Sequence, residues 1–136
     1  MKCIEIKSSQ REQWIPITSQ VEDAVRESGF LDGACLVYVP HTTAGVTINE
    51  NADPDVADDL LMGLARLIPR NLPFRHSEGN SDAHLKSSLV GCSVLVPVRK
   101  GRLQLGTWQG IYFGEFDGPR RRQCYIRFLR EGGNGA

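Results

Sequence analysis

Polar and apolar residues alternate near both ends of the chain, a pattern typical of strands with one face in a core. Residues 2–8 alternate in this way, and residues 14–18 form a shorter segment of the same kind. Residues 34–39 are apolar at successive positions, so we expect a strand covered on both faces, and residues 46–49 continue the sheet. Further strands are predicted at residues 93–98, at 103–116, where glycines interrupt the pattern, and at 123–129, with a turn at Gly101.

Helical spacing is found in two longer segments. Ser19 and Glu22 have the spacing of a capping box, in which both side chains satisfy backbone N–H groups at a helix start. This first helix is expected to stop near Gly29 and to bury one apolar side, formed by Val21, Ala24 and Val25.

The second helix is predicted to start at Asp53, with a side-chain cap and Pro54 in its first turn, and to end at Pro69. Its apolar positions recur at helical spacing at Val56, Leu60, Leu61, Leu64 and Ile68.

Residues 69–81 have no periodicity, and their prolines and glycine predict an ordered loop or a lid. Ser81 or Asp82 is expected to cap a short helix that runs to Ser88. Helices and strands occur in separate blocks rather than in strict alternation. The sequence therefore predicts an α+β fold with a mainly antiparallel sheet and two main helices.

Length and composition limit the kinds of partner. The 136 residues are enough for one domain, residues 1–130, and the polar, glycine-rich segment 131–136 is expected to be a flexible tail. Basic and acidic residues number 16 each, so no net basic character favours nucleic acid, and a small-molecule partner is expected. No apolar run resembles a signal peptide or is long enough to span a bilayer. We therefore expect a cytoplasmic protein.

The four cysteines are widely spaced and include no Cys-x-x-Cys pair. We expect each of them to be a free, small, buried hydrophobic residue in a reducing compartment rather than part of a disulfide framework. They are Cys3, Cys35, Cys92 and Cys124.

All three histidines lie in polar segments, and together they predict a metal site. Three neutral imidazoles leave a zinc ion its full positive charge and an open position for water or a phosphate oxygen. We therefore expect His41, His76 and His84 to bind one divalent metal, zinc above all. For His41 alone, a structural hydrogen-bonding role is the alternative.

Two further segments carry candidate catalytic and binding groups. Asn49 and Glu50 place an amide beside a carboxylate at a strand end. Both are catalytic candidates, and Glu50 is our candidate acid or base. Glu78 is a second candidate, and the backbone that follows it precedes a helix start whose N–H groups can receive an anion. The expected substrate-binding residues there are Gly79, Asn80, Ser81 and Asp82.

Late in the chain, Gln109 and Glu115 are polar groups in an apolar, aromatic strand region and are expected to need partners, so we include them among the catalytic candidates. Arg120 is expected to clamp a phosphate bidentately. The alternatives are a solvated charge run over residues 120–122, or pairing of Arg120 with Glu115 or Asp117.

The chain closely resembles the YjbQ family, often labelled secondary thiamine-phosphate synthase, over nearly the whole domain. The matching motifs are Pro40-His41-Thr42-Thr43-Ala44, Thr47-Ile48-Asn49-Glu50-Asn51, Asp53-Pro54-Asp55, the run from His76 to His84, Leu105-Gly106-Thr107-Trp108-Gln109, and Glu115-Phe116-Asp117-Gly118-Pro119-Arg120. The resemblance implies a sheet folded as a sandwich or half-barrel, a homotrimer, and metal binding by the three histidines. It also implies that a pyrimidine diphosphate and a thiazole phosphate are joined to give thiamine phosphate and pyrophosphate.

The chemistry of the residues leaves other activities open. Expulsion of pyrophosphate usually involves magnesium, whereas three histidines prefer zinc or another transition metal. The histidines therefore fit equally a metal-assisted hydrolase or another transferase. A non-enzymatic protein that binds a metal or a phosphorylated metabolite is the third alternative.

Overall fold

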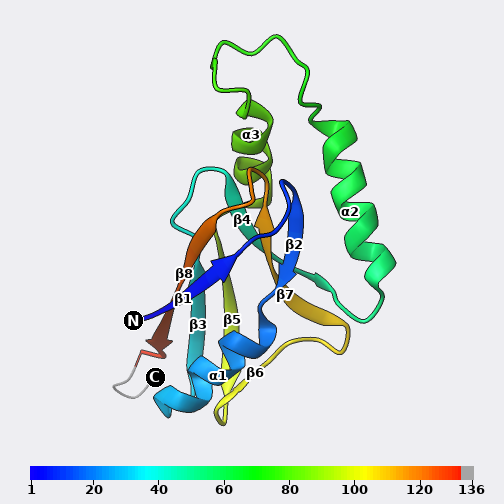
Figure 1. The fold of residues 1–136 in the computed structure, drawn as a ribbon. Coiled ribbons are helices and arrows are strands. Elements are labelled where there is room, and N and C mark those ends of the chain that lie inside the picture. Colours follow the sequence, from blue (N-terminus) through cyan, green and yellow to red (C-terminus); the bar gives the residue numbers. More distant parts are fainter. Residues whose placement is uncertain (133–136) are drawn as a thin grey trace.

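Two antiparallel sheets form the body of the protein in a computed structural model, which describes residues 1–132 (Figure 1). The larger sheet has the strand order β1-β8-β3-β5-β6, and the smaller one has the order β2-β7-β4. The strands of the larger sheet are β1 (Lys2–Lys7), β3 (Gly33–Tyr38), β5 (Ser93–Arg99), β6 (Arg102–Leu103) and β8 (Arg121–Arg130). Those of the smaller sheet are β2 (Gln13–Pro16), β4 (Ala44–Glu50) and β7 (Gln109–Glu115). The predicted α+β class with antiparallel sheets is confirmed.

The core lies between the sheets and includes one side of helix α1 (Thr18–Ser28). Alternate residues of several strands supply it, among them Val37 of β3, Phe113 of β7 and Ile126 of β8, all fully buried. Such a period of two is what sorts side chains between the inner and outer face of a sheet. The predicted strands at residues 2–8 and 123–129 thus correspond to β1 and β8 of the larger sheet, and the segment 14–18 to β2 of the smaller one.

Helix α1 confirms the predicted apolar side, since Val21, Ala24 and Val25 are buried, and it ends at Gly29 in the left-handed conformation. The predicted capping box at Ser19 and Glu22 is wrong. The cap position is Ile17, two residues before Ser19, and no side chain caps the helix. Thr18 instead accepts a hydrogen bond from the Ile111 backbone N–H, at 2.8 Å, so the helix start is tied to β7.

Strand β3 was predicted to be covered on both faces, and this is wrong. Cys35 and Val37 point into the core, while Tyr38 on the outer face is 42% exposed. The outer face continues on the neighbouring strands with Leu95 and Leu129, which are also exposed. Successive apolar residues therefore reflect a sheet with an apolar outer surface rather than a sheet buried between two layers.

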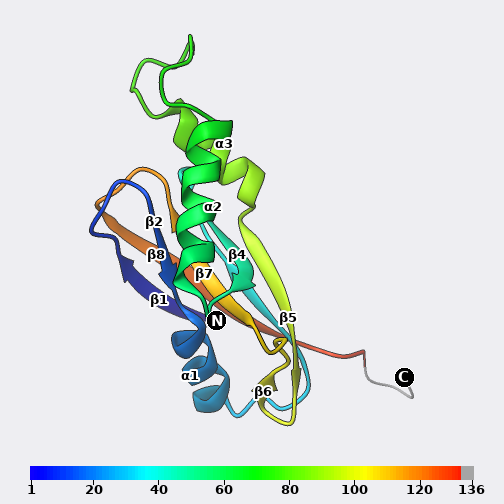
Figure 2. The ribbon, with the colours of Figure 1, turned by 90° about the vertical axis from the view of Figure 1, so that its right-hand side faces the viewer.

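Helix α2 (Pro54–Leu67) starts as predicted, because the Asp53 carboxylate accepts a hydrogen bond from the Asp55 N–H, at 3.0 Å. It ends at Ile68, directly before Pro69. None of its residues is buried. The helix stands beside the smaller sheet in both ribbon views (Figures 1 and 2). Its apolar side is only partly covered, since Val56, Leu60 and Leu64 are half-buried.

Helix α3 (Ser81–Val90) follows the predicted loop and crosses strand β4, where Ser87 donates a hydrogen bond to the Ala44 carbonyl, at 2.7 Å. Asn80 occupies the cap position and makes no capping bond with its side chain, so the prediction of a Ser81 or Asp82 cap is wrong. The predicted strand 103–116 is two strands, β6 and β7, separated by residues 104–108.

All four cysteines are free, as predicted, but only Cys35 and Cys124 are buried, and Cys3 and Cys92 are exposed. Burial raises the pKa of Cys35 to about 11 and that of Cys124 to about 12. No helix within residues 1–132 is long and apolar enough to cross a bilayer. The predicted flexible tail lies mostly at residues 133–136, outside the described residues.

Candidate functional site

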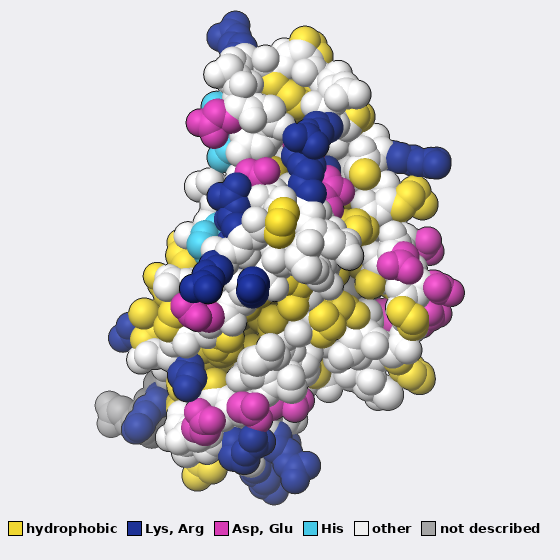
Figure 3. All heavy atoms as spheres, in the orientation of Figure 1, with side chains coloured by type: hydrophobic (Ala, Val, Ile, Leu, Met, Phe, Trp, Pro, Cys, Tyr) yellow, Lys and Arg dark blue, Asp and Glu magenta, His cyan; other side chains and the backbone are white. Residues whose placement is uncertain are grey.

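A polar cavity of about 470 Å³ contains side chains of all three histidines. Its lining residues are Pro40, His41, Thr42, Thr43, His76, Glu78, Asn80, His84, Asp117, Arg120 and Arg122. We call it the histidine pocket. In Figure 3, histidine side chains lie along one edge of the molecule next to Lys and Arg side chains, and acidic side chains gather on the opposite edge, over α2.

Four parts of the chain build the histidine pocket. His41 follows β3, and His76 belongs to the loop between α2 and α3. His84 lies in the first turns of α3, and Arg120 and Arg122 come from the turn before β8 and from β8 itself. Residues distant in sequence thus converge on one polar cavity, which is the usual construction of a ligand site.

His41 is fixed by a hydrogen bond from the Gln123 backbone N–H to its Nε2, at 2.9 Å. The lone pair of Nε2 is therefore occupied, and the neutral ring carries its proton on Nδ1. Burial, followed by the positive charge of Arg122, lowers the pKa of His41. His41 is thus a neutral hydrogen-bond donor near pH 7 in this orientation.

His76 and His84 lie side by side, with ring centroids 5.4 Å apart. His76 Nε2 lies 3.8 Å from a carboxylate oxygen of Glu78. Within residues 1–132, no three His, Cys, Asp or Glu side chains converge in a geometry that would hold a metal ion. The three histidines thus share a cavity but do not form a ready metal site in this conformation, because the free lone pair that a ligand needs is already used at His41 Nε2.

Arg122 and Glu115 form a buried ion pair behind the pocket, with Nε of Arg122 2.9 and 3.2 Å from the two carboxylate oxygens. Arg122 also donates to the Thr43 hydroxyl, at 2.8 Å, and Ser8 donates to Glu115, at 2.7 Å. Burial alone would raise the pKa of Glu115, but the bonds from Arg122, Ser8 and the Asp117 N–H outweigh it and lower that pKa. Glu115, a catalytic candidate from the sequence, is fully buried and holds Arg122 rather than lining the pocket.

Asp117 connects the two sides of the pocket. It accepts a hydrogen bond from the Asn80 side-chain amide, at 2.8 Å, and pairs with Arg120, at 3.0 Å. This pairing is the alternative that the sequence left open for Arg120. The guanidinium is still half exposed in the pocket, with its Nη1 making no bond to a described residue. The Asn80 side-chain oxygen is buried and has no hydrogen-bond partner among residues 1–132.

The prediction that the backbone N–H groups of residues 79–82 bind an anion stays a prediction. The Asp82 side chain itself does not line the pocket. It is fully buried and accepts two bonds from Arg11, at 3.0 and 3.2 Å, and one from Lys86, at 3.0 Å. Burial opposes ionisation, yet these bonds hold the pKa of Asp82 below its usual range. Ser81 is also buried, and Gly79 has the predicted positive φ, +78°. The network anchors the start of α3, which carries Asn80 and His84, to the loop between β1 and β2.

Three catalytic candidates lie elsewhere. Glu50 and Gln109 are paired across the far end of strands β4 and β7, and Asn49 is adjacent. Ala44, at the other end of β4, is six residues away from Glu50, about 20 Å along an extended strand. Gln109 accepts a bond from the Gly106 N–H before β7, and the Asn49 side chain accepts one from the Glu50 N–H at the end of β4, so both side chains bond to nearby backbone. Within one copy, these groups do not reach the histidines.

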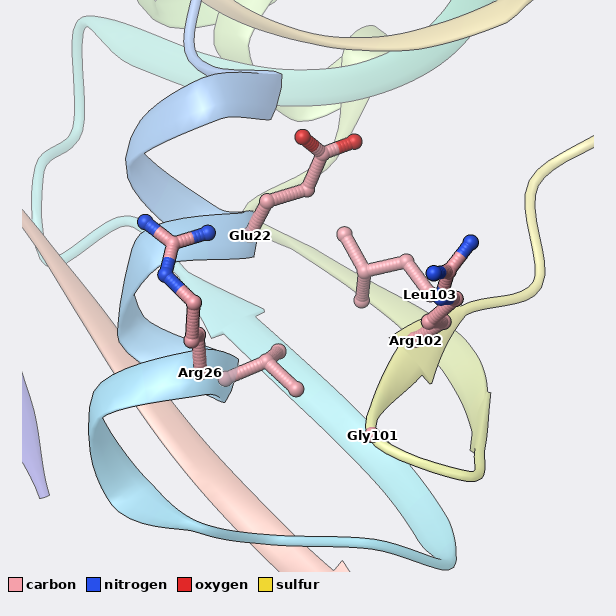
Figure 4. A pocket seen from close by; sticks show the side chains of 6 residues that line it. Glu22, Arg26, Gly101, Arg102 and Leu103 are labelled. Atoms are coloured by element: carbon pink, nitrogen blue, oxygen red, sulfur yellow. The ribbon is translucent and has the colours of Figure 1, made fainter.

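A different cavity of similar size lies between α1 and the turn from β5 to β6, with Glu22 and Arg26 on one side and Arg102 and Leu103 on the other (Figure 4). No histidine lines it. Arg26 is already paired with Asp23 on the surface. The histidine pocket is therefore the better candidate for chemistry.

The sequence matches the family model described as "UPF0047 protein YjbQ-like" over residues 2–131. The chain belongs to the YjbQ family. A UPF0047 protein of Methanocaldococcus jannaschii is 55% identical over 125 residues, with 92% of this chain and 91% of that protein covered. The UPF0047 protein YugU of Bacillus subtilis is 55% identical over 130 residues, with 95% and 98% covered.

Solved structures of YjbQ-family and related proteins share the fold. An uncharacterised conserved protein of the family from Clostridium acetobutylicum superimposes with a TM-score of 0.93 at 50% identity, covering 95% of this chain and all of that one (100%). A hypothetical protein from Aeropyrum pernix gives a TM-score of 0.91 at 39% identity, with 96% and 98% covered.

Sequence reasoning for this YjbQ-family chain missed Arg122, Thr42, Thr43 and Asp117 as pocket residues. The sequence suggests a phosphate clamp at Arg120 or a solvated charge run over residues 120–122. Arg122 is instead buried, with 4% of its surface exposed. The alternation along β8 indicates this position. Arg122 lies two and four residues before the core residues Cys124 and Ile126, so its side chain is on the same, inner face of the strand.

Proposed function

We propose that the protein is a cytoplasmic enzyme that acts on a phosphorylated small molecule bound in the histidine pocket. The observation that carries this proposal is the convergence of two arginines and three imidazoles on one cavity. Arg122 is paired with Glu115 and Arg120 with Asp117, but the Arg120 guanidinium is half exposed and has Nη1 free among the described residues, and Glu78 is largely exposed. Such a balance of donors favours an anion, and guanidinium groups match phosphate geometry.

The pocket residues suit phosphoryl or pyrophosphoryl chemistry. His41 offers an N–H donor held in place by Gln123, and the imidazoles of His76 and His84 line the same cavity as candidate acid–base groups. The unpartnered Asn80 oxygen would accept an N–H or O–H of the substrate. Thiamine-phosphate synthesis, with pyrophosphate as the leaving group, is the specific reaction proposed, and hydrolysis of a phosphate ester is the alternative.

A metal is part of this proposal. His76 and His84, with Glu78 nearby, are the groups that would begin a zinc site, and magnesium is the alternative with a diphosphate substrate. Zinc would supply a Lewis acid and an activated water. The metal content of the purified protein, and its loss in His76→Ala and His84→Ala, tests this part separately.

A homotrimer is proposed as the assembled form. The outer face of the larger sheet exposes Tyr38, Leu95 and Leu129, and α2 has no buried residue. A contact between copies would cover such surfaces, and it would also allow Glu50 of one copy to approach the histidine pocket of another. A monomeric mass by light scattering at micromolar concentration would contradict this part.

The central experiment measures pyrophosphate and inorganic phosphate binding by calorimetry, together with turnover in a phosphometabolite screen. Arg120→Gln is expected to weaken anion binding at least tenfold. Arg121→Gln is the matched control, because Arg121 neighbours it on the chain, is exposed, and does not line the pocket. Equal binding by both variants would refute an anion site here. Anion binding without turnover of any phosphorylated compound would support a non-enzymatic binding protein instead.

A further inference from the structure

A second cavity adjoins the histidine pocket and has a different chemical character. It measures about 580 Å³ and lies between the end of α2 and the side of α3. Its lining residues are Leu67, Ile68, His84, Leu85, Ser88 and Leu89. Four of these six side chains are aliphatic. We call it the aliphatic groove.

His84 belongs to both cavities. Asn80, His84 and Ser88 are spaced four residues apart along α3, so they lie on one side of the helix, with about 6 Å of rise between successive members. Asn80 lines only the histidine pocket, and Ser88 lines only the groove. The two cavities therefore follow one another along α3 and meet at a single imidazole.

The aliphatic groove is open to solvent at present. Leu67, Leu85 and Leu89 are 69%, 44% and 58% exposed, which is a high exposure for neighbouring leucines. Aliphatic surface of this kind gains free energy when a ligand covers it. The polar groups at its edge are the Ser88 hydroxyl and the His84 ring, so few partners exist there for the nitrogens of a polar heterocycle.

We infer that the histidine pocket and the aliphatic groove are one binding site for an aliphatic phosphate ester, with the phosphate among the arginines and histidines and the alkyl group along α3. This inference rests on the proposed anion site, and it names an aliphatic organic group in place of the pyrimidine and thiazole of the thiamine-phosphate reaction. The shared His84 ring supports this occupant over a purely apolar one, because it joins the groove to the cavity that Arg120 lines with its half-exposed guanidinium. An alkyl phosphate would fill the histidine pocket with its phosphate and cover the leucines of the groove with its alkyl group. Inorganic phosphate would leave those leucines exposed to solvent.

The test compares inorganic phosphate, butyl phosphate and hexyl phosphate by calorimetry on the full-length protein. Affinity is expected to rise with each methylene by between about two- and fourfold, the upper value being that of full burial of a methylene. In Leu89→Ser this gain is expected to shrink, while binding of inorganic phosphate is unchanged. Leu31→Ser is the matched control, because Leu31 is 61% exposed and lies outside both cavities.

Three outcomes decide between the alternatives. If inorganic phosphate and both esters fail to bind, the proposed function itself is wrong. If inorganic phosphate binds and the esters bind no more tightly, only the aliphatic groove is refuted as part of the site. If Leu89→Ser lowers the mass measured by light scattering while Leu31→Ser does not, a second copy of the chain occupies the groove, and the inference is overturned.

Discussion

Arg122 and Glu115 are paired beneath the histidine pocket with only 3% and 0% of their side-chain surfaces exposed. The two residues lie on neighbouring segments of different sheets, β8 and β7, so the pair links the sheets at the end where the pocket opens. Thr43, which precedes β4, joins them through Arg122. The pocket is thus built on a rigid charged network rather than on its loops alone.

Removal of one partner from this pair is expected to destabilise the protein strongly. Arg122→Met would leave the Glu115 carboxylate buried without its main partner, at a cost of about 3 to 5 kcal/mol in the free energy of unfolding. The double variant Arg122→Met with Glu115→Leu should be more stable than Arg122→Met alone, because no charge is then stranded. Urea unfolding of the wild type and both variants measures this. A loss below about 1 kcal/mol in Arg122→Met would mean that water reaches the carboxylate.

Acid is expected to destabilise the fold through Asp82 and Glu115. The pKa of each is lowered in the folded state, so the folded form binds fewer protons than the unfolded form near those values. Their stabilisation is complete above roughly pH 5, declines as the pH drops through the unfolded values near 4, and is lost below the folded pKa values. Urea midpoints from pH 7 to pH 2 should show this decline.

Asp82→Asn tests the assignment of that decline. The variant should be less stable at pH 7 and should lose less stability on acidification, because the group that titrates between Arg11 and Lys86 is then only Glu12, which is less buried than Asp82. Asp58→Asn is the control, since Asp58 is exposed on α2. The same pH dependence in Asp82→Asn as in the wild type would assign the acid sensitivity to other carboxylates.

The His41 ring is expected to show its tautomer directly. Because Nε2 accepts the Gln123 N–H, nitrogen NMR should find the proton of the neutral ring on Nδ1 and a pKa below the ordinary value of about 6.5. Bound phosphate should raise this pKa, because an anion stabilises the imidazolium. If added zinc instead displaces the Gln123 bond and shifts the His41 nitrogens together with those of His76 and His84, all three histidines are ligands, as the sequence predicted.

The sequence predicted most strands, two helix boundaries and the histidine segments, because these depend on local patterns. The alternation in β1 and β8, the Asp53 cap and the Gly29 stop are all decided by neighbours in the chain. What the sequence could not predict depends on contacts between distant segments. Asp82 looked like an anion-binding residue at a helix start, and only the fold places Arg11, 71 residues earlier, against it.

The same limit applies to the candidate site. Glu50 is a candidate as a carboxylate at a strand end, and Gln109 as a polar group in an apolar strand region, yet the register of β4 and β7 puts both at the end of the sheet away from the histidines. The histidines themselves converge only because α3 folds back over β4. The motifs identify candidate functional residues, but they do not show which of them are close in space. Within one copy, the histidines form one cluster, and Glu50 and Gln109 form another.

A methyl group added at Gly118 is expected to disturb the histidine pocket. A Cβ there would clash with the Gln10 carbonyl oxygen and lie 2.6 Å from the Ser8 hydroxyl, and the Gly118 N–H donates to the Arg11 carbonyl, at 2.9 Å. Gly118→Ala should therefore cost about 1 to 3 kcal/mol and displace the turn that carries Asp117 and Arg120. Phosphate affinity should fall with it.

Gly63→Ala is the matched control for this glycine. Gly63 lies inside α2, and an added Cβ would have no heavy atom within 4 Å apart from the excluded chain neighbours and helix backbone. Because glycine is a poor helix former, this variant should gain roughly 0.5 to 1 kcal/mol and bind phosphate as the wild type does. Thermal melts and calorimetry on both variants check the pair. Unchanged phosphate affinity in a folded but destabilised Gly118→Ala would show that the turn at 117–120 supports the fold and not the anion site.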